Sequence, residues 1–218
     1  MELNLKSLRE QVYEYLKEQI NRQNLKGGDY IDINALSDQL KISKTPLRDA
    51  LLQLEMDGFV TIKPRKGILI NKLDQNDIRY FYEIIGSLEC AIIQQLCPYI
   101  DNKLIEQLKN YNNLMQKALD ESNFDLYYEN NLNFHNTYLS LSKNHYALKI
   151  IENLRQRLYD FPRKSHYLPE WERRSIKEHD SFIELLEKDC PKAAIFMKDV
   201  HWSFSVQEKF IIEYYFKE

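Results

Sequence analysis

The fold of the N-terminal third is decided by the segment Ser43-Lys44-Thr45-Pro46-Leu47-Arg48-Asp49-Ala50-Leu51. Ser43 or Thr45 can cap the free N–H groups at the start of a helix, and Pro46 falls in the first turn, where its missing N–H does no harm. Apolar residues then recur at helical spacing and form one stripe, which consists of Leu47, Ala50, Leu51 and Leu54. The segment therefore predicts a helix that packs on a hydrophobic core through one face.

The opposite face of this predicted helix is cationic. Lys44 and Arg48 stand four residues apart, so both side chains project from its N-terminal end. A recognition helix in the major groove of DNA contacts base edges and phosphates through such N-terminal residues. For the pair taken alone, a capped surface helix with solvated charges is the alternative interpretation.

A second, shorter helix is predicted just upstream. Asn34 can cap it, Leu36 and Leu40 give it an apolar side, and Lys41-Ile42-Ser43 joins it to the recognition helix. Before it, residues 30–33 form a short β-rich run that can add a strand to a neighbouring sheet.

A basic hairpin is predicted downstream. After Gly58, a suitable residue to end a helix, two β-rich runs cover residues 59–63 and 68–70. They enclose the cationic tip Pro64-Arg65-Lys66-Gly67. Two helices, a turn and a basic hairpin make a winged helix-turn-helix, so the flanking sequence favours DNA binding over the solvated-helix alternative.

The segment from Leu25 to Ile70 resembles the DNA-binding domain of the GntR family of bacterial transcription regulators. That family has a glycine-containing lead-in, here Gly27-Gly28, a Ser-Arg-Thr-Pro-Val-Arg-Glu-Ala-Leu core and a wing that ends in glycine. Lys44 replaces an arginine of the core, and an ammonium group lacks the planar fork that binds guanine through two hydrogen bonds. The resemblance implies DNA contacts from Asn34, Lys44, Thr45, Arg48, Arg65, Lys66 and Gly67.

Charge is distributed unevenly along the 218 residues. The net charge is −3, yet residues 41–72 hold seven lysines and arginines against three acids, whereas the chain after residue 72 holds 18 against 23. Phosphate binding is therefore expected in the N-terminal third alone. We expect two domains: a winged helix-turn-helix over residues 1–72, and an effector-binding and dimerisation domain over residues 73–218.

The three cysteines, Cys90, Cys97 and Cys190, lack the spacing of a zinc knuckle. Their odd number and the lack of a signal peptide predict reduced thiols, buried as small hydrophobic groups, in a cytoplasmic protein. No apolar run approaches the roughly 20 residues that a membrane-spanning helix needs.

The second domain reads as an antiparallel bundle of about six helices without strands. The predicted helices cover residues 74–97, 101–120, 123–141, 146–160, 169–188 and 191–215, and residues 161–167 form a loop. The fold class is therefore mainly α, with the small hairpin as the exception.

Three of the five histidines lie in the apolar stripes of different predicted helices. His135, His179 and His201 each have apolar or aromatic neighbours three and four residues away. His145 and His166 lie in turn or loop sequence and are expected to be solvated. One buried histidine is usually a hydrogen-bonded core residue, but three in one bundle can share a divalent metal, because neutral imidazole is a common ligand of Zn and Ni.

Residues 74–215 resemble the FCD domain, the helical effector-binding partner of the GntR reader in the FadR-like branch. Metal-binding members use an aspartate and three histidines, and a carboxylate effector often completes the coordination shell. The resemblance assigns these positions to Asn131, His135, His179 and His201. Asn131 replaces the aspartate, so we expect a weaker metal site.

A second departure concerns the effector. The Glu-Val-Arg-Arg-x-Leu-Glu pattern of the family's first bundle helix reads Glu83-Ile84-Ile85-Gly86-Ser87-Leu88-Glu89 here, so both arginines are lost. An organic acid remains the expected effector, in a less cationic pocket.

The sequence thus predicts a homodimeric transcriptional regulator that binds a palindromic DNA operator and senses a small carboxylate in a metal-containing bundle. We expect a repressor rather than an activator. A regulator with a metal-free pocket is one alternative. A metal-dependent hydrolase or lyase is another, but Glu178, the acid beside His179, is expected to point away from the histidine stripe, which leaves no evident general base. We therefore expect no enzymatic activity.

Overall fold

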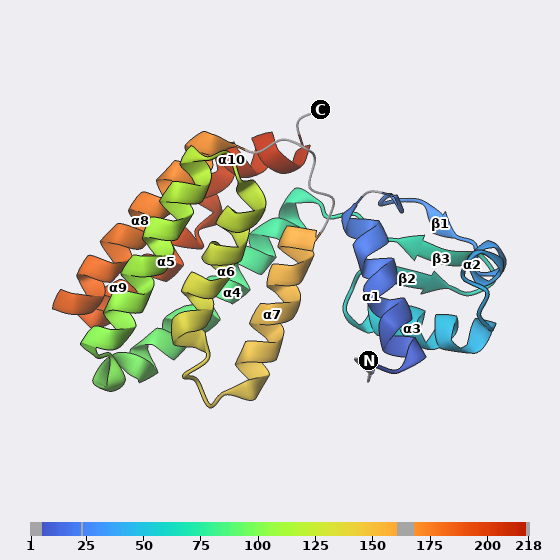
Figure 1. Ribbon diagram of the computed structural model, residues 1–218, viewed down its shortest axis with the longest axis horizontal. Coiled ribbons are helices and arrows are strands. Elements are labelled where there is room, and N and C mark those ends of the chain that lie inside the picture. The colour runs from blue at the N-terminus through green and yellow to red at the C-terminus, as the bar shows by residue number, and fades with distance from the viewer. Residues whose placement is uncertain (1–5, 23, 161–167, 217–218) are drawn as a thin grey trace. The chain divides into compact units, whose positions relative to one another are not determined.

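The computed structural model describes residues 6–22, 24–160 and 168–216 (Figure 1). Its contacts divide the chain into two compact units. The first comprises the residues up to Asp74 together with the end of helix α7 from Arg155, and the second begins at Gln75. The boundary between residues 72 and 73 stays a prediction of where two independently folding domains meet.

The first unit is a winged helix-turn-helix. Its elements are α1 (Leu8–Asn21), β1 (Tyr30–Ile31), α2 (Ile33–Leu40), α3 (Lys44–Met56), β2 (Val60–Lys63) and β3 (Gly67–Ile70). The sheet has the order β1-β3-β2 and is antiparallel throughout, with Tyr30 opposite Leu69 and Thr61 opposite the same residue on the other side (Figure 1). The predicted hairpin and the added N-terminal strand are both confirmed.

The apolar stripes predicted for this unit meet in one core. Leu16 of α1, Leu47 and Leu51 of α3, and Phe59 before β2 are fully buried in it. Gly58 follows the last residues of α3 with a positive φ of 81°, a conformation that favours glycine and ends the helix there.

One predicted helix cap is wrong. Helix α2 is capped by Asp32, whose carboxylate accepts hydrogen bonds from the N–H groups of Asn34 and Ala35 at 2.8 and 3.1 Å. Asn34 therefore lies inside the first turn. Aspartate and asparagine are both good caps, and the two residues are only two positions apart. The sequence alone therefore does not decide which of them caps the helix.

The second unit is all-helical in the described chain. It contains α4 (Gln75–Leu96), the 3₁₀ turn η1 (Cys97–Tyr99), α5 (Asn102–Asp120), α6 (Phe124–Leu139), most of α7 (His145–Asp160), α8 (Pro169–Lys188), α9 (Cys190–Phe196), the π-turn η2 (Met197–His201) and α10 (Phe204–Phe216). Helix α5 packs against both α6 and α8, and α4 packs against α9 and η2 (Figure 1). No described helix is long and apolar enough to cross a membrane.

The last predicted helix is not continuous. The sequence predicts one helix over residues 191–215, but a π-turn interrupts it at Met197–His201 and α10 starts afresh at Phe204. A π-turn inserts an extra residue into the helical repeat and is frequent at functional sites. Helical periodicity cannot reveal this insertion, because the apolar positions on both sides of it are each regular.

The prediction of three buried thiols is wrong. Cys97 and Cys190 form a disulfide that links the end of α4 to the start of α9, with Cα atoms 5.7 Å apart. Cys90 is the free cysteine, and all three residues are half-buried. The two partners are 93 positions apart in the chain, and only tertiary structure brings them together.

Two sequence expectations lie outside the described residues, namely the loop over residues 161–167 and the solvated His166 within it.

The disulfide predicts the number of accessible thiols and a stability change. Unfolded, non-reduced protein should react with one equivalent of a thiol reagent, and reduced protein with three. Cys97→Ser should lower the free energy of unfolding by about 2–4 kcal/mol, because a long loop is no longer closed in the unfolded chain. Urea denaturation measures this, with Cys90→Ser as the control, and equal stabilities of the two variants would contradict the role of the bridge.

Candidate functional site

The recognition helix is positioned by its own apolar stripe. Leu47 and Leu51 are fully buried, and this fixes the rotation of α3 about its axis. Lys44, Thr45 and Arg48 are consequently exposed on the opposite side, as the spacing predicts. Ser43 occupies the cap position without a side-chain hydrogen bond to the helix, so the first N–H groups of α3 receive none from it.

The tip of the wing is a tight turn between β2 and β3. Arg65 has a positive φ of 63° and Gly67 a φ of 110°, so the backbone turns sharply and leaves Arg65 and Lys66 exposed. Asn34 is exposed as well, near the start of α2. Within the described chain, Lys44, Arg48, Arg65 and Lys66 take part in no ion pair, so their charges are available to an external anion.

In the second unit, His135 of α6, His179 of α8 and His201 of η2 lie together. One ligand nitrogen of each lies within 4.8 Å of the other two. The ring centroids are 4.9 to 5.4 Å apart, and the side chains of His135 and His179 are fully buried. The sequence prediction that these three residues share one site is supported by this geometry.

Asn112 of α5 fixes the tautomer of His179. Its amide nitrogen donates to the backbone oxygen of Ile176 and to Asp180 Oδ1, at 3.1 and 2.6 Å. Its Oδ1, 3.2 Å from His179 Nδ1, must therefore accept a hydrogen bond from that ring nitrogen. The lone pair of His179 then lies on Nε2, which is buried without a hydrogen-bond partner.

Glu178 fixes the tautomer of His201, and this contact corrects the prediction made for Glu178. The carboxylate was expected to point away from the histidines, but it is 7 % exposed, and its Oε2 lies 3.0 Å from His201 Nδ1. Gln207 and Arg174 donate to it as well. Burial raises the pKa of Glu178, but the hydrogen bond and charge of His201 and the other two donors outweigh it, so the pKa lies below its usual value.

His135 is held by a buried acid from α4. The hydroxyl of Tyr138 donates a hydrogen bond to Glu89. The Nδ1 of His135, 2.7 Å from the Tyr138 oxygen and 3.2 Å from Glu89 Oε2, is therefore the donor in its own contacts. All three imidazoles thus carry a proton on Nδ1 and have their lone pair on Nε2, the nitrogen that can bind a metal. This is the usual arrangement of metal-binding histidines.

The neutral form of the central imidazole is also favoured. Burial lowers the pKa of His179 well below its usual value, and the neighbouring His201 and His135 lower it further. A neutral ring is the form that binds metal. The fourth predicted ligand, Asn131, is buried on α6 one turn before His135, on the same face of the helix. His145 is exposed, as expected.

Sequence reasoning missed the residues that orient the imidazoles. Glu89 is completely buried on α4, and an acid within the apolar run around Ile92 and Ile93 is the signal that could have revealed it. Asn112 offers no comparable signal, because asparagine is common on exposed helix faces.

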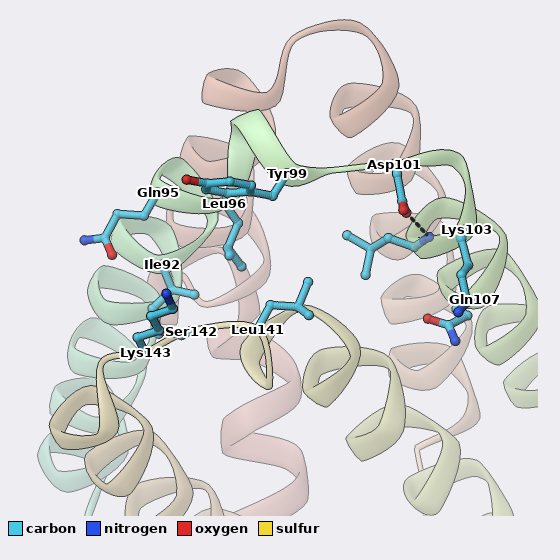
Figure 2. Close-up of a pocket in the computed structure, with 11 residues that line it drawn as sticks. Ile92, Gln95, Leu96, Tyr99, Asp101, Lys103, Gln107, Leu141, Ser142 and Lys143 are labelled. Atoms are coloured by element: carbon cyan, nitrogen blue, oxygen red, sulfur yellow. Dashed lines mark hydrogen bonds between the residues drawn. The ribbon is translucent and has the colours of Figure 1, made fainter.

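A separate cavity of about 640 Å³ lies at another part of the second unit (Figure 2). It is bordered by the end of α4, by η1, by the start of α5 and by the segment after α6. Tyr99, Leu141, Lys103 and Lys143 are among the side chains that line it, and none of the three histidines does.

Comparison with known proteins decides the family. The model of "Bacterial regulatory proteins, gntR family" matches residues 8–70, and that of the FCD domain matches residues 80–196. The chain belongs to the FCD-containing gntR family of bacterial regulators. The family description and the names of the relatives are those of transcriptional regulators.

Among curated relatives, the HTH-type transcriptional repressor RspR of Escherichia coli is 25% identical over 146 residues, which are 67% of this chain and 64% of that protein. The Nta operon transcriptional regulator of Aminobacter aminovorans is 30% identical over 131 residues, 60% and 62% of the two chains. These matches therefore span less than two thirds of each relative. Among solved structures, E. coli McbR/YncC has a TM-score of 0.70 at 21% identity and covers 95% of this chain and 97% of its own.

The cationic face of α3 predicts a measurable salt effect. Arg48→Ala should weaken binding to a mixed-sequence duplex and lower the slope of log affinity against log salt by about 0.9, because one phosphate contact is lost. Fluorescence anisotropy at several salt concentrations measures this. Arg173→Ala, which removes an exposed arginine of α8, is the matched control and should bind like the wild type. An unchanged slope in Arg48→Ala would exclude the arginine from the interface.

Proposed function

We propose that the protein is a homodimeric repressor that binds a palindromic operator and releases it in response to a small organic acid. The DNA contacts come from Asn34, Lys44, Thr45, Arg48, Arg65, Lys66 and Gly67. The exposure of all seven residues and the unpaired state of the four cations support this assignment. Two-fold symmetry of a dimer matches the symmetry of a palindromic site.

We further propose that Asn131, His135, His179 and His201 hold a divalent metal, Zn or Ni. The observation that carries this proposal is the buried Nε2 of His179, which has no hydrogen-bond partner although Asn112 holds its ring in place. Leaving a buried polar atom without a partner costs about 1–3 kcal/mol, and a metal ion shared with two further imidazoles removes that cost. Once bound, the ion supplies a Lewis-acidic position for an external oxygen ligand.

The effector acts in this proposal by favouring one arrangement of the dimer. An organic acid bound through the metal would be linked by the three histidines to α6, α8 and η2 at once. It shifts the equilibrium only if the DNA-binding and released arrangements bind it with different affinities. Repression is proposed because the relative RspR is named a repressor. Cytoplasmic location follows from DNA binding.

The alternative to this metal site is a metal-free pocket, and experiment must decide between the two. In that case the three imidazoles would share water molecules in place of an ion. The hydrolase or lyase alternative is not retained, since the family consists of regulators.

Metal content separates these alternatives. Purified protein dialysed against Zn or Ni should retain about one equivalent per chain by plasma mass spectrometry, and His179→Ala should lose most of it, because a central ligand is gone. His145→Ala is the control, since that histidine is exposed and should not affect uptake. Equal metal content in the two variants would contradict the site.

The fourth ligand has a test of its own. Asn131→Asp should raise metal affinity, on the order of tenfold, because a carboxylate adds a negative charge to the ligand set. Asn131→Leu should lower it. Competition with a chromogenic chelator measures both, and three indistinguishable affinities would place Asn131 outside the coordination shell.

Selection of DNA duplexes from a random library tests the proposed operator. Duplexes enriched from a random library by the wild-type protein should contain inverted repeats, and enrichment of a single asymmetric half would contradict the dimer.

A further inference from the structure

Helix α4 and the π-turn η2 approach each other closely at Gly86. A Cβ built on Gly86 would lie 2.8 Å from Trp202 Cβ and 3.4 Å from Lys198 Cα, which is too close for any residue other than glycine without a shift of the turn. Trp202, the residue directly after η2, therefore packs directly against α4 at Gly86.

This packing places the indole beside the histidines. The ring centroid of Trp202 lies 5.7 Å from that of His135 and 5.4 Å from that of His201, and Tyr82 packs against it edge-on at 5.2 Å. Trp202 is 4 % exposed. It also lines an open cavity of about 460 Å³ bordered by α4, η2 and the start of α10.

The polar atom of this side chain has no partner. Trp202 Nε1 is buried and makes no hydrogen bond, although an indole N–H can only donate and normally finds an acceptor when buried. Trp171 shows the normal case, because its Nε1 donates to Gln207 Oε1 at 3.0 Å. Leaving a buried donor without an acceptor is unfavourable, so the site is more stable when an external acceptor is present.

The side chains around the histidines indicate the charge of that acceptor. Within the described chain, the ionisable side chains that hydrogen-bond to the three imidazoles are the carboxyls of Glu89 and Glu178 and the phenol of Tyr138. Two acids beside one divalent ion leave little positive charge for a polyanion. A ligand with a single negative charge, one oxygen for the metal and a lone pair for the indole fits better, and a monocarboxylate has this chemistry.

We propose that Trp202 is a specificity-determining residue, whose indole N–H donates a hydrogen bond to a metal-bound monocarboxylate. Gly86 makes room for it, because a Cβ at that position would collide with Trp202. This inference rests on the proposed metal site.

Cobalt-loaded protein provides the test, because the visible absorption of Co²⁺ changes when its ligands change. Acetate titrated into the wild type should shift the spectrum with saturation. Trp202→Phe, which keeps an aromatic ring but lacks the N–H, should bind Co²⁺ equally and acetate about tenfold more weakly. Trp171→Phe is the matched control and should bind acetate like the wild type.

A second measurement keeps Trp202 in place and follows its fluorescence. In Trp171→Phe, Trp202 is the sole tryptophan, and acetate should change its fluorescence when zinc is bound and leave it unchanged in metal-free protein. Equal acetate affinity of Trp202→Phe and wild type, both loaded with Co²⁺, would overturn the role of Trp202 alone. Failure of the wild type to take up Co²⁺ would overturn both this inference and the metal site.

Discussion

The proposed metal site depends on one constraint: each of three imidazoles must present the same nitrogen to a common point. A histidine ring can turn over and can carry its proton on either nitrogen, so burial alone does not achieve this. Asn112, Glu178 and the Tyr138–Glu89 pair each bind one Nδ1 and remove both freedoms. Because these partners come from α4, α5, α6 and α8, the packing of four helices is tied to the orientation of three rings.

The same constraint explains why the helix is interrupted by the π-turn η2. His201 must face Glu178 with one nitrogen and the other two histidines with the other, while Trp202, the next residue, must pack on Gly86. Consecutive residues of a regular α-helix point about 100° apart, which follows from 3.6 residues per turn. The extra residue of η2 changes that relation locally, and α10 then resumes a regular course that carries Gln207 to Glu178.

Much of this could be predicted from the sequence, for identifiable reasons. The stripe through Leu47 and Leu51 fixes α3, and with it the exposure of Lys44 and Arg48, because a helix has only one apolar face to bury. The histidines could be assigned to a single site because each interrupts an apolar stripe. What could not be predicted depends on contacts between distant positions: Glu89 meets His135, and Cys97 meets Cys190, only after folding.

X-ray absorption spectroscopy of the zinc- or nickel-loaded protein can show whether the three Nε2 atoms bind one metal ion. About three imidazole nitrogens, recognisable by the more distant scattering of their rings, should surround the metal, at about 2.0–2.1 Å for zinc, together with oxygen. A shell of oxygen alone, or one with sulfur from the cysteines, would contradict the proposed metal site.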